Sequence, residues 1–373
     1  DPRDSYTLDP NDDDRPFDSV VDLSLRWMDK VRGAGQPFFM NFCTKFVHGP
    51  FSTRDRKRLE HYCKKMGVPF PTDSGRIANM DPGFRNPYYA AMLDTLDWQV
   101  GKILTYLETT DDPRNPGHKL IDNTYIMVSS DNGGLERAPI ARGSDRGRPE
   151  RVTDNTPLNA GKHKVFEGGI RIPFIIAGPG IEQGSVCDTP IHLVDLFPTY
   201  MAMAGAEPKP ELNLDGCNVL PVFLGQESDV KLADGTVRES LFWHYPGVTS
   251  SSSIIRKGDW KLRLNYAPEL NGLPPIMLYK LYNDDGSICD LGEANNLAES
   301  HPEKTNALLA ELQEWLAKSD AAMPYKNAQM FGGSPLPGTD RVPTVLERQS
   351  AGKRLEVLVE TGADKSKVVE AKL

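Results

Sequence analysis

A short apolar run that ends in a polar, glycine-bearing turn constrains this chain more than any other stretch. Residues 125–128 read Tyr-Ile-Met-Val, which is typical of a strand, and Ser129-Ser130 closes the run. Asp131-Asn132-Gly133-Gly134 follows where that strand would end. In open α/β sheets ligands bind beyond the carboxyl ends of the strands, and two glycines allow a sharp turn there. The pattern therefore favours an α/β fold with a site at this strand end.

Three side chains near this turn have useful chemistry. A carboxylate beside an amide oxygen, here Asp131 and Asn132, suits a hard cation. Farther along, Lys162 precedes Glu167-Gly168-Gly169 and Arg171, and its ammonium group is a mobile donor for an anion. Taken singly, Asp-Asn-Gly-Gly is a good turn signal and Lys162 a solvated surface lysine. Because the two occur in this order and with these neighbours, together they indicate a functional site more specifically than either does alone.

The two motifs together resemble the type I sulfatases of the alkaline-phosphatase superfamily. That family has a strand ending in Ser-Asp-Asn-Gly. It then has Asn-x-Pro-Leu-x-x-Gly-Lys, four residues, and Glu-Gly-Gly-x-Arg-x-Pro. Residues 155–173 fill every fixed position of this segment. The resemblance implies an alkaline-phosphatase-like α/β fold, with a mostly parallel sheet flanked by helices, and hydrolysis of a sulfuric ester.

A histidine occupies another loop that follows a predicted strand. Residues 37–42, Pro-Phe-Phe-Met-Asn-Phe, are too apolar to alternate and are predicted to form a buried strand, as in parallel sheets. His48 comes just after it, where a histidine can act as an acid, a base or an anion donor, or can be a plain surface residue. In the sulfatases a Pro-Phe-Phe strand leads to a His-x-Pro whose histidine contacts the sulfate ester, and His48 occupies that place.

Sulfate ester hydrolysis needs an in-line nucleophile, cations at the equatorial oxygens and a proton for the leaving oxygen. The resemblance implies that Asp131 and Asn132 ligate one calcium ion, which would act as template and Lewis acid. It implies that Lys162 and His48 are the catalytic residues that contact the sulfate or the leaving oxygen. Glu167 and Arg171 are expected to hold their loop by an internal ion pair.

The nucleophile that the family uses is not found in the sequence. It is a formylglycine made from the first residue of Cys-x-Pro-x-Arg or Ser-x-Pro-x-Arg, and neither motif occurs here. The family's paired N-terminal aspartates and its Gly-Lys-x-x-His segment are missing too. The resemblance covers about residues 17 to 320. We therefore expect these parts upstream of Asp1, and expect this chain to be a fragment of an active sulfatase that does not turn over substrate alone.

Composition limits the partners. The net charge of −9 argues against nucleic acid, and the absence of a run of 18 apolar residues argues against a transmembrane segment. The odd number of cysteines, five, excludes a fully paired intrachain framework. The expected partner is a sulfated small molecule or a glycan. An extracytoplasmic location, periplasmic or secreted, follows from the resemblance alone, and the sequence indicates no oligomeric state.

The chain is expected to have three parts. Residues 1–228 form the C-terminal part of the catalytic domain, 229–320 a smaller antiparallel sheet packed by a helix, and 321–373 a linker and an extension with strand-like segments. In the second part, strands are predicted at 240–244, 252–256, 260–264 and 277–282, with a helix at 302–318. Lys257-Gly258-Asp259 is predicted to form a hairpin turn. In the first part, helices are predicted over 17–31 and 88–107.

The helix at 88–107 has an apolar stripe and two nearby acids. The predicted buried face comprises Leu93, Leu96, Val100, Ile103, Leu104 and Leu107. Asp94 and Asp97 are three residues apart, a spacing that a metal site could use. We interpret them as structural residues.

Two other functions stay open. A phosphomonoesterase or phosphonate hydrolase of the same superfamily shares Asp-based metal sites, although Glu-Gly-Gly-x-Arg-x-Pro favours a sulfatase. A catalytically inactive protein that binds sulfated glycans has one supporting feature, an arginine-rich stretch between the two motifs that also fits a solvated loop. Its arginines are Arg137, Arg142, Arg146, Arg148 and Arg151. Among active sulfatases, the long polar loops favour a carbohydrate substrate.

Overall fold

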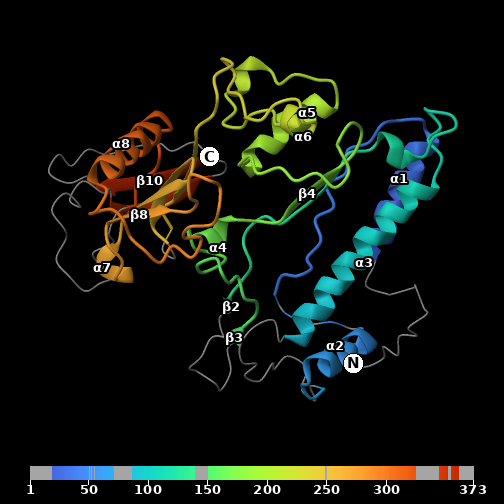
Figure 1. Cartoon of the computed structure of the whole chain (residues 1–373), viewed down its shortest axis with the longest axis horizontal. Coiled ribbons are helices and arrows are strands. Elements are labelled where there is room, and N and C mark those ends of the chain that lie inside the picture. The colour runs from blue at the N-terminus through green and yellow to red at the C-terminus, as the bar shows by residue number, and fades with distance from the viewer. Residues whose placement is uncertain are drawn as a thin grey trace.

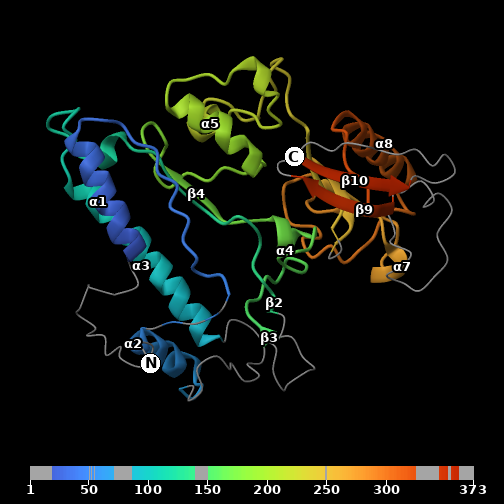
Figure 2. The ribbon, with the colours of Figure 1, turned by 180° about the vertical axis from the view of Figure 1, so that it is seen from behind.

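A computed structural model describes residues 19–49, 51, 53, 55–70, 86–138, 150–247, 250–324, 344–351 and 354–360. Two long helices, α1 (Ser19–Gly33) and α3 (Pro87–Thr109), lie side by side at one end of the molecule (Figure 1). A sheet covered by α8 (Pro302–Lys318) forms the other end. Between them runs the segment of the predicted site, with α4 (Glu167–Ile170) and β4 (Phe174–Ala177) (Figures 1 and 2).

Helix α3 begins at a side-chain cap and ends near its predicted limit. The Asn86 side chain accepts a hydrogen bond from the backbone N–H of Tyr89 at 3.0 Å, and Pro87 takes the first helical position. The predicted buried face is wrong in part, because Leu93 is 48% exposed whereas Met92 and Gln99 are buried. Helix α3 packs against α1, against α2 (Arg56–Met66), against η1 (Leu120–Asn123) and against the segment around Thr44. Its buried positions therefore follow these contacts rather than one leucine stripe.

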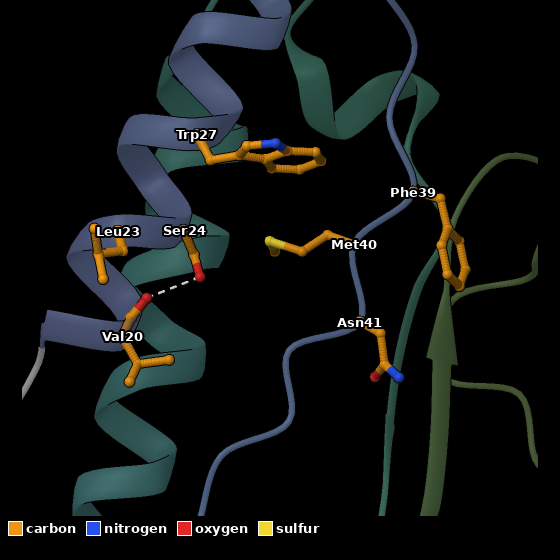
Figure 3. Close-up of a pocket in the computed structure, with 7 residues that line it drawn as sticks. All are labelled: Val20, Leu23, Ser24, Trp27, Phe39, Met40 and Asn41. Atoms are coloured by element: carbon orange, nitrogen blue, oxygen red, sulfur yellow. Dashed lines mark hydrogen bonds between the residues drawn. The ribbon is translucent and has the colours of Figure 1, made fainter. Parts of the chain in front are cut away.

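The segment 37–42 is extended but is not part of a sheet among the described residues, so the predicted buried strand is wrong in that respect. Phe38 and Met40 pack against a small core of Met28, Leu107 and Leu120. Phe39 points the other way and is 66% exposed. Figure 3 shows this alternation, with Met40 directed toward α1 and Phe39 away from it, beside an apolar pocket of about 370 Å³.

The central ribbon pairs β1 (Ile126–Ser129) with β4 in antiparallel register, with Ile126 opposite Ala177 and Ser129 opposite Phe174. In the described part of the chain all strand pairs are antiparallel, which corrects the expected mostly parallel sheet for these residues. A parallel pair needs a crossover of a dozen or more residues, usually a helix. Only loops, one two-residue strand pair and the four-residue α4 are described between β1 and β4.

That two-residue pair lies within the arginine-rich stretch. Strands β2 (Arg137–Ala138) and β3 (Glu150–Arg151) pair antiparallel, with Arg137 opposite Arg151. Arg142, Arg146 and Arg148 lie outside the described residues. The structure therefore leaves the glycan-binding role of this stretch as a hypothesis.

The C-terminal sheet confirms the predicted antiparallel sheet packed by a helix. Strands β5 (Ser240–Tyr245), β6 (Ser252–Lys257), β7 (Trp260–Asn265) and β8 (Ile276–Lys280) follow one another in sequence order. Gly258, at a φ of 55°, makes the tight turn between β6 and β7. Helix α8 packs its leucines onto one face of the sheet, and the Phe242 and Trp315 rings stack at 4.8 Å.

The remaining helices and strands complete the described part. They are η1 (Leu120–Asn123), η2 (Leu193–Asp195), α5 (Leu196–Met203), η3 (Pro210–Leu212), α6 (Leu220–Phe223), α7 (Pro268–Asn271), β9 (Thr344–Ala351) and β10 (Arg354–Glu360). All five cysteines are free thiols. None of the helices in the described residues has the length and apolar character that crossing a membrane requires.

Candidate functional site

The turn after β1 presents its polar side chains at the surface. Asp131 is exposed and Asn132 is partly exposed. The Ser130 hydroxyl donates to the carbonyl of Asn132 at 2.8 Å, and the Ser129 hydroxyl donates to the carbonyl of Pro173 at 3.2 Å. These bonds tie the turn to itself and to the start of β4. The two predicted metal ligands therefore sit on a constrained bend.

Close backbone contacts at glycines join this turn to the segment that carries Lys162. The Gly133 N–H donates to the carbonyl of Gly169 at 2.9 Å, and the Lys162 N–H donates to the carbonyl of Gly134 at 2.9 Å. A Cβ atom on Gly133 would collide with the carbonyl of Gly168, so only glycine fits at this crossing. The structure thus brings Lys162 next to the turn of Asp131 and Asn132, as the order of the motifs predicted.

Asn155 closes the loop that holds Lys162. Its side-chain amide donates to the carbonyls of Gly134 and Ala160, both at 2.9 Å. Ala160 has a φ of 55°, a backbone conformation that a non-glycine residue adopts at a cost, and the Asn155 bond supports it. The Lys162 side chain, partly exposed, extends from a backbone that is fixed on both sides.

His48 belongs to a loop that packs at the start of α3. Its Nδ1 lies 2.8 Å from the carbonyl of Gly49, so Nδ1 carries a proton and Nε2 is left for another partner. Two residues past Gly49, the Phe51 ring lies 6.1 Å from the Tyr89 ring. Tyr89 is hydrogen-bonded to Thr153, whose methyl group is close to Gly134. Contacts through Phe51, Tyr89 and Thr153 thus connect the loop of the exposed His48 to the Gly134 turn. In the described part of the chain, no hydrogen bond or ring contact joins His48 directly to Asp131, Asn132 or Lys162.

Glu167 is buried in an ionic cluster that the sequence did not predict. The expected pair with Arg171 is long, at 3.8 Å, and Arg171 instead donates to the hydroxyl of Tyr282 at 2.5 Å. The Nζ of Lys261, on β7, lies 2.8 Å from Glu167 and 2.8 Å from Glu293. All three charged side chains are at most 2% exposed. We name these three residues the buried triad.

The buried triad links the Lys162 segment to the C-terminal sheet. The backbone N–H of Glu167, at the start of α4, donates to Glu293 at 2.5 Å. Burial opposes ionisation of Glu167, but the ammonium of Lys261 outweighs it and holds the pKa of that carboxyl below its usual range. Burial dominates at Glu293 and raises its pKa. One lysine therefore faces two buried acids, and the balance of burial and charge moves their pKa values in opposite directions.

A second contact joins the same two regions. The Arg263 guanidinium, on β7, lies 4.6 Å from the centre of the Phe166 ring, a cation–π contact beside α4. Lys261 and Arg263 alternate with Leu262 along the strand, so one face of β7 meets α8 and the other meets the Lys162 segment. Two basic residues at alternate positions of a buried strand were a sequence signal for a charged contact on that face of β7, and the sequence analysis did not use it.

The donors that could hold a metal are few in the described residues. No group of three or more His, Cys, Asp and Glu side chains suited to a metal ion occurs among them. Asp131 and Asn132 are oxygen donors of the kind calcium prefers, but calcium takes six to eight oxygen ligands. The turn therefore fits calcium in the chemistry of its donors and supplies only part of a coordination sphere.

Two acidic side chains outside this loop have structural contacts. Asp94 accepts from the Tyr62 hydroxyl at 3.2 Å and pairs with Arg58 at 2.9 Å, which supports its structural interpretation. Buried Asp195 pairs with Arg238 at 2.5 Å and accepts from the backbone N–H of His192. These contacts stabilise the fold next to the site without lining it.

Comparison with known proteins agrees with the motifs. Residues 3–206 match the family model described as Sulfatase. The chain is 29% identical over 322 residues to a sulfatase of Formosa agariphila, covering 82% of this chain and 50% of that protein. It is 27% identical over 302 residues to human arylsulfatase A, covering 76% of this chain and 52% of that protein. The chain thus spans about half the length of the curated relatives it matches.

A solved structure shares the fold. It is described as concerning the metabolism of multiple glycosaminoglycans by Bacteroides thetaiotaomicron, and it aligns with a TM-score of 0.55 at 22% identity. The alignment covers 80% of this chain and 55% of that one. At this identity the likeness shows a common fold.

Proposed function

The chain belongs to the sulfatase family, and from that premise we propose that it supplies the sulfate-binding part of a sulfuric ester hydrolase. One observation carries the proposal. The Lys162 backbone is bonded to Gly134 at 2.9 Å, two residues after Asn132, so a cationic donor and two oxygen ligands share one rigid loop pair. That arrangement suits an anion held between an ammonium group and a bound cation.

Each residue has a role in this proposal. Asp131 and Asn132 would hold part of the coordination sphere of a calcium ion, which when bound would offset the charge on the sulfate oxygens. Lys162 binds the same oxygens, and the loop bonds at Gly134 and Asn155 keep it positioned. His48 would act on the leaving oxygen through Nε2, and the engagement of its Nδ1 by Gly49 supports this role.

The nucleophile is proposed to come from outside these residues. No Cys-x-Pro-x-Arg or Ser-x-Pro-x-Arg sequence occurs in the chain, so a formylglycine has no precursor within it. We expect residues 1–373 to bind a sulfate ester without hydrolysing it. Sulfate release above a buffer blank by the purified chain would contradict this part of the proposal.

The substrate class is proposed to be a sulfated carbohydrate, in an extracytoplasmic location. The glycosaminoglycan description of the structurally similar protein supports the class, as do the polar loops around the site. The location rests on the family resemblance alone.

The test is ligand binding to residues 1–373, because it does not need the nucleophile. Calorimetric titration with 4-nitrocatechol sulfate in the presence of calcium should show binding that weakens at least about tenfold in Lys162→Ala and His48→Ala, since each loses one contact to a charged group. Lys209→Ala, an exposed lysine near η3, is the matched control and should bind like the parent chain.

Two further titrations separate the alternatives. Asp131→Ala should abolish the calcium dependence of binding. The corresponding phosphate ester should bind more weakly than the sulfate ester; tighter binding of the phosphate ester would favour a phosphomonoesterase or phosphonate hydrolase instead.

A further inference from the structure

The helix that follows the His48 loop is strongly basic although the chain as a whole is acidic. Helix α2 has the sequence Arg-Lys-Arg-Leu-Glu-His-Tyr-Cys-Lys-Lys-Met, with five basic residues and one glutamate, a net charge of +4. The whole chain has a net charge of −9. Positive charge is therefore concentrated on this helix.

Helix α2 is a rigid support for that charge. Its inner face packs Leu59 and Cys63 against Tyr88. Asp55 accepts from the backbone N–H of Arg58 at the start of the helix, and Gly67, at a φ of 67°, ends it. The Arg58 side chain is used internally, because it pairs with Asp55 at 3.0 Å and with Asp94 at 2.9 Å.

The outer face of α2 keeps its other charges available. Lys57, His61 and Lys64 are exposed and, spaced by four and three residues, share one side of the helix, with exposed Lys65 beside them. Glu60, the single acid of the helix, pairs with Arg56 at 2.7 Å. Among the described residues no acidic side chain forms an ion pair with Lys57 or Lys64. We name Lys57, His61, Lys64 and Lys65 the basic face.

Helix α2 is joined to the His48 loop through a shared apolar cluster. Phe51, two residues past Gly49, packs against the cluster of Leu59, Cys63 and Tyr88. Tyr88 packs on α2, whereas Tyr89 contacts Phe51 of the His48 loop and Thr153 beside Gly134. Figures 1 and 2 both show α2 at the α3 end from which this turn starts.

We propose that the basic face of α2 is a docking surface for the anionic flank of a multiply sulfated glycan chain. This inference rests on the proposed function and deepens it, because it distinguishes a polymer from a single sulfated sugar. Several cations along one helix neutralise several sulfates at once and release their counterions, so binding is strong at low salt and falls steeply as salt rises. A sulfated polymer is favoured over nucleic acid because the proposed function gives this chain a binding site for a sulfate ester.

The experiment measures the affinity of residues 1–373 for heparin and chondroitin sulfate as a function of salt. The test variant is Lys57→Gln with Lys64→Gln and Lys65→Gln, since glutamine keeps helix propensity and removes the charge. The matched control replaces three exposed lysines elsewhere, Lys30, Lys209 and Lys304, by glutamine. Circular dichroism of both variants checks that the fold is kept.

The expected result is affinity for heparin at least about tenfold lower in the test variant, with a salt slope smaller by roughly two units, and a change of less than about twofold in the control. Equal losses in both variants would overturn the inference, and so would a parent chain that fails to bind either glycan. Equal affinity of the parent chain for hyaluronan, which has carboxylates but no sulfate, or for duplex DNA would overturn it as well.

One further variant separates this inference from the proposed function. Lys162→Ala should lose affinity for 4-nitrocatechol sulfate and keep heparin affinity within about twofold, because the basic face is intact. Heparin binding that depends on α2 while Lys162→Ala leaves aryl sulfate binding unchanged would sustain the docking surface and contradict the proposed sulfate-binding loop. Heparin binding that does not depend on α2, together with loss of aryl sulfate binding in Lys162→Ala, would overturn the docking surface alone.

Discussion

The two ends of this molecule use apolar residues in different ways. In the C-terminal unit, Ile255, Leu262, Leu278 and Leu312 are fully buried between the four-stranded sheet and α8. In the rest of the described chain, Phe39 beside α1 and Ile175 in β4 are 66% and 65% exposed. The first unit finds its packing partners close by in sequence, whereas the second has apolar faces that its described neighbours leave open. An apolar run that is typical of a strand therefore predicts burial only where its packing partner is close to it in the sequence.

The segment of the candidate site runs between the two ends, and charge joins it to the C-terminal unit. The buried triad joins α4 of the Lys162 segment to β7 and to the loop after β8. If this junction is what organises the site, its loss should affect the molecule more than any single change within either end.

The largest expected effect follows from removing Lys261. Lys261→Met leaves two buried glutamates without a counter-charge and should lower the free energy of unfolding by about 3–5 kcal/mol. Urea denaturation measures the change. Lys280→Met, on the neighbouring strand β8, removes an ion pair with the exposed Asp284 and should cost less than about 1 kcal/mol of unfolding free energy.

A rescue variant sharpens this prediction. Adding Glu167→Gln and Glu293→Gln to Lys261→Met removes the uncompensated charges and should recover part of the lost stability. A Lys261→Met chain that unfolds like the parent chain would show that the buried triad does not stabilise the junction of the Lys162 segment with the C-terminal sheet.

A smaller effect separates the cores of the two ends. Leu312→Ala, in α8, creates a cavity against the sheet and should cost about 2–5 kcal/mol of unfolding free energy. Leu23→Ala, on the exposed side of α1, should cost less than about 0.5 kcal/mol because that side chain is 57% exposed. Thermal unfolding of both variants measures the difference in stability. Similar losses of unfolding free energy in the two variants would mean that the apolar side of α1 is covered in solution.

The smallest effect is a pH dependence at a second junction. His192, which accepts from the N–H of Val194 at 3.2 Å, lies with its ring 5.0 Å from Trp243 of β5, and burial lowers its pKa. The folded chain therefore binds fewer protons at His192 than the unfolded chain. Its contribution to stability is complete above the unfolded pKa of about 6.5 and is lost as pH falls through the lower folded value.

The measurement is the unfolding temperature between about pH 5 and 8. We expect a decline on the acid side that is reduced in His192→Gln, with a difference on the order of 1 kcal/mol. His301→Gln, which leaves His192 in place, should keep the decline. An unchanged profile in His192→Gln would show that the acid sensitivity of the chain arises elsewhere.

The sequence predicted local elements around the candidate site. The apolar run before Asp131 forms β1, and the backbone bond of Lys162 to Gly134 brings the two motifs together. In the C-terminal unit, the hairpin turn at Gly258 and the helix at 302–318 agree with the prediction. The roles of His48, Lys162, Asp131 and Asn132 stay predictions.

What the sequence determined by itself is therefore the identity of the site loops and the periodic elements, because turn residues and apolar spacing act within a few residues of one another. What the tertiary structure alone decided is which charges meet. Lys261 is 94 positions from Glu167, and Glu293 is 126 positions from it, so no local pattern could pair them or displace Arg171 as the expected partner. The antiparallel pairing of β1 with β4 and the buried sides of α1 and α3 depend likewise on neighbours that are distant in the chain.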